Sequence, residues 1–219
     1  MIGFYDYTVW LTYISLMSGA AGIFAAVNGH IYPAAFFLLF SGLCDAFDGK
    51  VARTKKDRTE MQKIYGIELD SLADIVAFGC LPVAIGYSLL VSFYGGKLKM
   101  SVFVVTILLV LMVYVLAALI RLAYYNATEY ARTKEETGDR KEYSGLPVTS
   151  AALVYPLIIL INSVSKVDIT VAYFAVMFLM AVAFILPIKV KKPSLKGVIA
   201  MVIIGVVEFL IIFLKGFVI

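Results

Sequence analysis

Charged side chains are scarce in this sequence of 219 residues. Asp, Glu, Lys and Arg make up 16% of the chain, whereas hydrophobic residues make up 62%. The mean hydropathy is +0.95. A water-soluble domain of this length needs far more polar surface, so the composition excludes an ordinary soluble protein. Segments that alternate between apolar and polar residues are also lacking, which argues against a transmembrane β-barrel.

Histidine and cysteine, the residues that most often bind zinc, are nearly absent. His30 is the only histidine, and its setting in "NGHIYP" predicts a surface turn. The two cysteines, Cys44 and Cys80, lie in apolar stretches, where they are expected to be small buried side chains. A zinc site built from histidine and cysteine is therefore not expected.

Apolar runs of membrane length recur along the chain, each long enough to cross a hydrocarbon core roughly 30 Å thick. We predict an all-α polytopic membrane protein, because helices satisfy their own backbone groups in lipid. One membrane-embedded domain is expected over residues 1–219, with a six-helix core and a C-terminal helix. The seven transmembrane helices are predicted at residues 8–28, 32–53, 67–94, 101–126, 147–164, 169–188 and 197–217.

Lysine and arginine are distributed unevenly between the ends of these helices. If the N-terminus is cytoplasmic, most of them fall on the cytoplasmic side, and only Lys97, Lys99, Lys166 and Lys215 fall on the other. Positive residues favour the cytoplasmic side of a membrane protein. We therefore predict an integral protein of the cell membrane with a cytoplasmic N-terminus. The basic residues suit lipid head groups or a phosphate-bearing substrate better than nucleic acid.

Four aspartates interrupt the apolar pattern in "DAFDGKVARTKKDRTEMQKIYGIELDSLAD", residues 45–74. Asp45 and Asp48 share a helix face with Gly49, and Asp70 and Asp74 share a face on the next helix. A tight helical hairpin would point both pairs toward each other. Acids of this kind are rare within membranes and usually functional, although one or two often only cap helices or pair with neighbouring lysines.

Carboxylates held close together repel unless a positive charge lies among them. Hard divalent cations prefer such oxygen ligands, and two of them a few ångströms apart form a clamp for phosphoryl transfer. Gly49 and Ala52 leave room for a ligand at the helix backbone, and Arg53 suits a phosphate. The pattern predicts a metal-dependent site at the cytoplasmic end of the membrane.

These residues resemble the signature of the CDP-alcohol phosphotransferases. The family pattern is D-x2-D-G-x2-A-R, followed by a gap and then G-x3-D-x3-D. Every fixed position of this pattern is filled in the sequence. One departure is the gap between Arg53 and Gly66, which is longer than the family usually carries. The segments "ELDSLADIVAFGCLP", "RLAYYN" and "GLPVTSAA" further resemble the phosphatidylserine synthase branch.

The resemblance implies a reaction in which an alcohol attacks the lipid-side phosphorus of a CDP-linked lipid and CMP leaves. The donor would be CDP-diacylglycerol or CDP-archaeol, the acceptor L-serine, the cofactor two Mg²⁺ or Mn²⁺ ions, and the enzyme a homodimer. Asp74 would be the general base. The metal ligands would be Asp45, Asp48, Asp70 and Asp74, and the CDP-lipid would be bound by Gly49, Ala52, Arg53 and Gly66.

Three further residues stand out. Arg121 follows a long apolar run at the start of "RLAYYN" and is a candidate ligand for the serine carboxylate or the donor phosphate, although an ordinary interfacial anchor has the same pattern. Asn126 is a second candidate for a polar contact with substrate. Glu208 lies inside the last predicted helix, and the sequence offers no partner for it.

Two other functions fit parts of the pattern. The same chemistry could use glycerol phosphate or inositol phosphate as acceptor, since basic residues follow Arg53. A divalent-cation transporter could also use intramembrane carboxylates. A transporter would more naturally carry its acids near the middle of the membrane within related halves, and the sequence shows no internal repeat.

Overall fold

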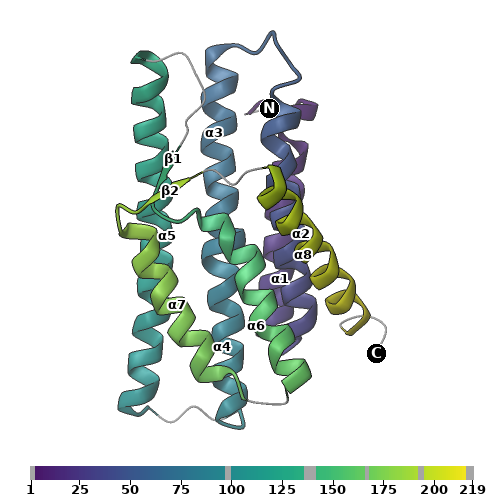
Figure 1. The fold of residues 1–219 in the computed structure, drawn as a ribbon, viewed down its shortest axis with the longest axis vertical. Coiled ribbons are helices and arrows are strands. Elements are labelled where there is room, and N and C mark those ends of the chain that lie inside the picture. The colour runs from purple at the N-terminus through teal and green to yellow at the C-terminus, as the bar shows by residue number, and fades with distance from the viewer. Residues whose placement is uncertain (1–2, 97–99, 136–141, 166–167, 192–194, 216–219) are drawn as a thin grey trace.

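A computed structural model describes residues 3–96, 100–135, 142–165, 168–191 and 195–215 (Figure 1). The described elements are helical except for two strands of three residues. In chain order they are η1 (Tyr7–Val9), α1 (Trp10–Val27), α2 (Ile31–Ala52), α3 (Glu60–Asp74), η2 (Ile75–Cys80), α4 (Leu81–Phe93), α5 (Val102–Glu135), β1 (Glu142–Ser144), η3 (Val148–Ser150), α6 (Ala151–Ser165), α7 (Thr170–Ile185), β2 (Lys189–Lys191) and α8 (Leu195–Phe213).

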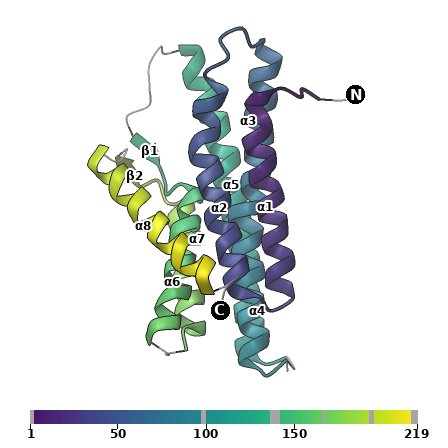
Figure 2. The ribbon, with the colours of Figure 1, turned by 90° about the vertical axis from the view of Figure 1, so that its right-hand side faces the viewer.

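Four long helical segments stand side by side, and α6, α7 and α8 pack against one side of them (Figure 2). Because α3, η2 and α4 form one continuous helix, the described chain has seven helical segments, as predicted. The segments long and apolar enough to cross a membrane are Tyr7–Val27, Ile31–Ala52, Glu60–Phe93 and Val102–Tyr130. This arrangement confirms the prediction of an all-α polytopic membrane protein.

Two helix ends differ from the prediction by more than a few residues. The third helix begins at Glu60 instead of residue 67, because Thr59 and Gln62 form a capping box. The Thr59 Oγ1 accepts a hydrogen bond from the Gln62 backbone N–H at 3.2 Å, and Gln62 Oε1 accepts one from the Thr59 N–H at 2.9 Å. The fourth predicted helix continues beyond residue 126 to Glu135.

Glycines allow the helices to approach closely. A Cβ on Gly19 of α1 would lie 3.0 Å from the Ala77 Cα of η2, and one on Gly42 of α2 would lie 2.5 Å from the Ala152 Cβ of α6. Either contact would force the backbones apart. Small residues at such crossings are typical of membrane helix packing, where close van der Waals contact replaces the hydrophobic effect.

The helix that carries Asp70 and Asp74 changes its winding directly after them. Residues Ile75–Cys80 form a π-helical segment, and Pro82 follows in the first turn of α4. Pro82 has no N–H to donate to the Phe78 carbonyl four residues before it. The buried Tyr114 hydroxyl of α5 donates to that carbonyl at 3.0 Å. Tyr114 therefore fixes α5 against the irregular segment beneath the aspartates.

Removing this hydroxyl should destabilise the protein. In Tyr114→Phe the ring still fills its place, but the bond to the Phe78 carbonyl is lost. We expect the free energy of unfolding to fall by about 1 kcal/mol, the usual range for one buried hydrogen bond. Thermal unfolding of the purified protein in detergent would measure this. Tyr87→Phe, at a more exposed ring of α4, is the matched control, and equal stability of both variants would contradict the role of Tyr114.

Glu208 of α8 is buried, with 3% of its surface exposed. Neither carboxyl oxygen has a hydrogen-bond partner among the residues that the structure describes. It lines an apolar pocket between α6 and α8 with Leu157, Leu160 and Val207. Glu208 therefore faces the protein interior, and its carboxyl group has no partner among the described residues.

Candidate active site

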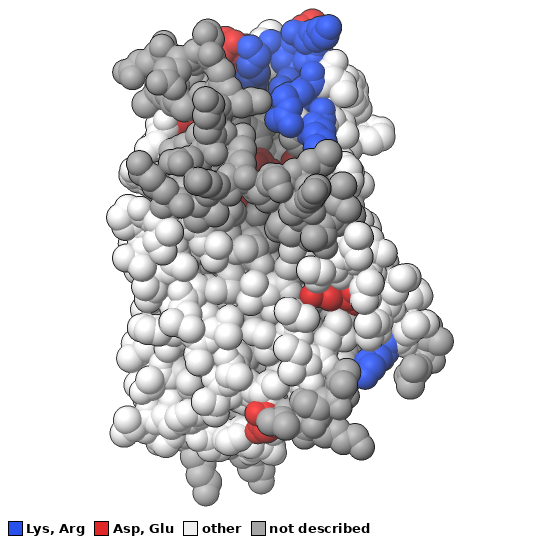
Figure 3. Space-filling view, in the orientation of Figure 1, with Lys and Arg blue, Asp and Glu red and all other residues white. Residues whose placement is uncertain are grey.

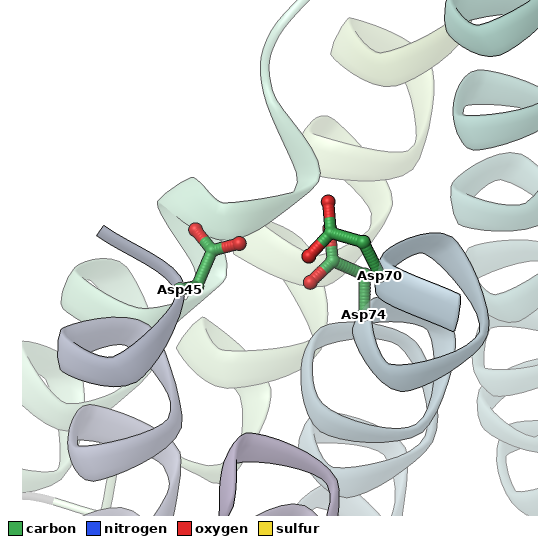
Figure 4. Close-up of side chains that lie close together, drawn as sticks. All are labelled: Asp45, Asp70 and Asp74. Atoms are coloured by element: carbon green, nitrogen blue, oxygen red, sulfur yellow. The ribbon is translucent and has the colours of Figure 1, made fainter. Parts of the chain in front are cut away.

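Three of the four aspartates converge at one point between α2 and α3. Asp45 of α2 faces Asp70 and Asp74 of α3 (Figure 4). One carboxylate oxygen from each lies within 4.8 Å of the others. Asp74 is buried, with 7% of its surface exposed. The spacing of four residues between Asp70 and Asp74 places both on the same face of α3, one turn apart.

Asp48 lies one turn along α2 from Asp45 and is also buried, at 7% exposed. Its Oδ2 accepts a hydrogen bond from the Thr12 hydroxyl of α1 at 3.1 Å. Asp48 and Asp70 line the same pocket. The fourth aspartate thus extends the acidic group from the cluster of three toward this pocket.

The two aspartate helices do not form the tight hairpin that the spacing led us to expect. α2 and α3 have few close contacts with each other, whereas α1 packs against both. Residues 53–59 connect them outside the helices. Asp48 of α2 and Asp70 of α3 line a pocket at this place, together with residues of α1.

This pocket has a volume of about 270 Å³, close to the lower limit of roughly 300 Å³ for small-molecule sites. Every residue predicted to bind the CDP-lipid lines it, namely Gly49, Ala52, Arg53 and Gly66. The Arg53 guanidinium covers Gly49, with Nη1 3.5 Å from the position that a Cβ would take there. Gly49 of α2 and Gly66 of α3 thus lie on the parts of the pocket lining that the two helices contribute.

The N-terminal segment forms a third wall, which the sequence analysis missed. Thr8, Val9 and Thr12 line the pocket. Asp6 caps this segment by accepting a hydrogen bond from the Thr8 N–H, and Lys55 Nζ lies 2.9 Å from Asp6 Oδ2. The hydrogen bonds from Thr8 and then from Lys55 lower the pKa of Asp6 to about 2, so its carboxylate is charged at neutral pH. The only signal in the sequence was the four-residue spacing of Thr8 and Thr12.

Basic side chains gather at the end of the molecule that carries the connection between α2 and α3 (Figure 3). Arg53, Arg58 and Lys63 line the pocket. Below this end, the described surface in the same view carries few charged side chains (Figure 3). The acidic cluster therefore lies close to the basic end of the molecule, since Asp70 belongs to the cluster and lines the same pocket as these basic residues.

Arg121 of α5 lies outside the residues that line the pocket and is buried, at 5% exposed. Its Nε donates to the Leu146 carbonyl at 3.2 Å, and its guanidinium carbon lies 5.3 Å from the centre of the Tyr125 ring. Gly145 has a φ of +82° beside it, and a Cβ there would lie 3.2 Å from Arg121 Nε. The "GLP" segment therefore packs directly on this arginine.

Asn126 of α5 contacts the aspartate helix. Its Nδ2 donates to the Ser71 hydroxyl, next to Asp70, at 2.7 Å. Earlier in α5, Ala118 lies beside Gly79 of η2. The Ala118 Cβ is 3.7 Å from the position that a Cβ on Gly79 would take. These two contacts show which part of α5 lies beside the segment from Ser71 to Gly79, which contains Asp74. Arg121 lies between Ala118 and Asn126 in the sequence, so it is at about the same height along the bundle as Asp74.

The chemistry of the cluster fits a hard divalent cation. Its three donors are all carboxylates, and no histidine or cysteine belongs to the group among the described residues. Mg²⁺ and Mn²⁺ prefer such oxygen ligands, whereas zinc sites usually contain nitrogen or sulfur. A partly buried acidic cluster beside a pocket at one end of an apolar helical bundle defines an integral membrane protein with a candidate metal site.

The family is identified by comparison with known proteins. Residues 8–214 match the family model described as CDP-alcohol phosphatidyltransferase. The chain belongs to this family. The match covers the pocket, the four aspartates and Arg121, which confirms the resemblance found in the sequence.

Several curated proteins are similar to this chain. A CDP-diacylglycerol–serine O-phosphatidyltransferase of Saccharomyces cerevisiae is 34% identical over 65% of this chain and 50% of its own. An enzyme of the same name from Helicobacter pylori is 31% identical over 68% of this chain and 55% of its own. An archaetidylserine synthase of Methanothermobacter thermautotrophicus is 26% identical over 85% and 69%. The chain thus spans about half the length of the first two relatives.

Proposed function

We propose that this protein transfers the phosphatidyl or archaetidyl group from a CDP-linked lipid to the hydroxyl of L-serine and releases CMP. The observation that carries the proposal is the cluster of Asp45, Asp70 and Asp74 beside a glycine-lined pocket. Membership of the family and the names of the similar curated proteins support it. The donor would be CDP-diacylglycerol or CDP-archaeol.

The aspartates would hold two Mg²⁺ or Mn²⁺ ions, with Asp48 completing the set of four ligands. When bound, the ions supply positive charge that neutralises the diphosphate of the donor and favours departure of CMP. Asp48 and Asp70 line the pocket, so the nucleotide is expected on their side. Asp45 and Asp74 lie beyond the pocket lining, which leaves their side of the cluster to the acceptor.

Asp74 would act as the general base. Serine has a weakly nucleophilic hydroxyl, so a base within hydrogen-bond reach is needed. The serine oxygen would form a bond to the lipid-side phosphorus, its proton would pass to Asp74, and the bond from that phosphorus to the CMP oxygen would break. The burial of Asp74 limits the access of water, which would otherwise compete as acceptor.

We place the site at the cytoplasmic face of the cell membrane. The basic residues at the pocket end support this orientation, since positive charge favours the cytoplasmic side. A water-soluble acceptor and a lipid-anchored donor can both reach a site at the interface. The homodimer implied by the family resemblance is part of the proposal, and light scattering of the purified protein in detergent would measure it.

The proposed function is tested by CMP release from purified protein in detergent. The assay contains CDP-diacylglycerol or CDP-archaeol, Mg²⁺ or Mn²⁺, and one acceptor at a time. We expect release with L-serine and none with glycerol 3-phosphate or inositol phosphate. Release with one of the phosphate-bearing acceptors would keep the chemistry and overturn the substrate. No release with any pair would favour a cation transporter, which metal flux into vesicles would detect.

Arg121 is proposed to bind the serine carboxylate. It lies level with Asp74, and an arginine can donate two parallel hydrogen bonds to a carboxylate. Arg121→Lys keeps the charge but loses this geometry, so the KM for serine should rise about tenfold while the KM for the CDP-lipid stays the same. Steady-state kinetics with each substrate varied would show this. A rise in both KM values, or in neither, would contradict the assignment.

A further inference from the structure

Arg58 lies in the connection between α2 and α3, within the gap of the family signature that is longer than usual. Its side chain is half-buried and lines the pocket. Nη1 lies 3.9 Å from the position that a Cβ on Gly66 would take, so the guanidinium covers this glycine. Its Nε is buried and has no hydrogen-bond partner among the residues that the structure describes.

The neighbouring lysines differ from Arg58 in this respect. Lys55 is bonded to Asp6 at 2.9 Å, and Lys63 is bonded to Glu60 at 2.7 Å. Both lysines therefore have carboxylate partners within the protein. A buried donor without a partner costs free energy, so each such group in a native structure calls for an explanation. Arg58 has the contacts of a ligand-binding side chain.

The position of Arg58 indicates which part of a nucleotide it meets. Gly66 precedes Asp70 by one helical turn, or roughly 6 Å along α3, and Asp74 is one turn farther. If the proposed function holds, the diphosphate oxygens lie with the metal ions at the aspartates. The nucleoside then extends past Gly49 and Gly66 toward Arg58, which lines the same pocket beside Gly66.

We propose that Arg58 recognises the cytosine base of the CDP-lipid, an inference that rests on the proposed function. Cytosine presents two adjacent hydrogen-bond acceptors, O2 and N3, which suit the paired donors of a guanidinium. Uracil carries an N–H at position 3 and offers no such pair. Arg58 thereby becomes a residue that determines specificity for the donor nucleotide, in addition to the residues of the family signature.

Binding of CMP, UMP and inorganic pyrophosphate to the full-length protein in detergent with Mn²⁺ tests this, by titration calorimetry. We expect the unsubstituted protein to bind CMP more tightly than UMP. Arg58→Ala should weaken CMP binding about tenfold, in keeping with the loss of hydrogen bonds from a charged donor. UMP and pyrophosphate binding should change little. Arg58→Lys, which keeps the charge but not the paired donors, should behave nearly like Arg58→Ala.

Lys56→Ala is the matched control, because Lys56 is exposed in the same connection and does not line the pocket. It removes the same charge and should leave CMP binding unchanged. Unchanged CMP binding in Arg58→Ala would overturn the inference, as would equal weakening for CMP, UMP and pyrophosphate, which would indicate a phosphate contact. If the unsubstituted protein bound no CMP, the proposed function itself would fail and the inference with it.

Discussion

Asp74→Asn is expected to reduce serine-dependent CMP release by at least about 10³-fold, within the range for loss of a general base. Asparagine has nearly the same shape and is as easily buried, but it cannot accept the serine proton. It also removes a negative charge from a cluster whose oxygens lie within 4.8 Å of one another. The substitution should therefore leave the fold intact, and CMP release by the purified variant would measure the loss.

Asp57→Asn is the matched control for this experiment, because Asp57 is exposed in the connection between α2 and α3 and lies outside the cluster. It should retain full activity. Asp74→Asn should unfold at the same temperature as the control, which separates catalysis from stability. A variant that kept a tenth of the activity or more would show that Asp74 is not the base.

Removal of divalent cations is expected to abolish CMP release completely. Mg²⁺ or Mn²⁺ should restore it, whereas Zn²⁺ should not, since the cluster offers only carboxylates among the described residues. Asp45→Asn should raise the metal concentration needed for half-maximal activity by at least roughly 100-fold. Loss of a residue that only hydrogen-bonds to a metal ligand typically lowers metal affinity 10–100-fold. Asp45 is proposed to bind the metal directly, so its loss should cost at least as much.

The measurement is a titration of metal into chelator-treated protein, followed by CMP release, with Asp57→Asn as the control. Equal metal dependence of Asp45→Asn and the control would contradict the assignment of Asp45 as a ligand. Activity that persists after exhaustive chelation would contradict the metal site as a whole.

Much of the architecture could be predicted because membrane helices depend mainly on long apolar runs. These runs are local in the sequence, and they predicted the order and approximate positions of the seven helical segments in the described chain. The missed start at Glu60 depends on Thr59 and Gln62, a polar capping box outside any apolar run. The π-helical segment at Ile75–Cys80 could not be predicted, because it is stabilised in part by Tyr114, a residue far away in the sequence.

The candidate site, too, could be predicted from the sequence only in part. The four-residue spacing of Asp70 and Asp74 fixed their common face, and the structure brings them to Asp45. The wall formed by Thr8 and Thr12 could not be foreseen, because it depends on how α1 packs between the two aspartate helices. Arg58 could not be distinguished from neighbouring surface lysines until the structure placed it over Gly66.

The central claim is that the serine hydroxyl attacks the lipid-side phosphorus of the CDP-linked donor. The most direct test supplies serine labelled with ¹⁸O in its hydroxyl, together with the purified protein, the donor and Mn²⁺, and analyses both products by mass spectrometry. The account predicts that the label appears in the new lipid phosphodiester and that CMP is unlabelled. Labelled serine attached to CMP, with phosphatidic acid or its ether-lipid equivalent as the other product, would contradict it.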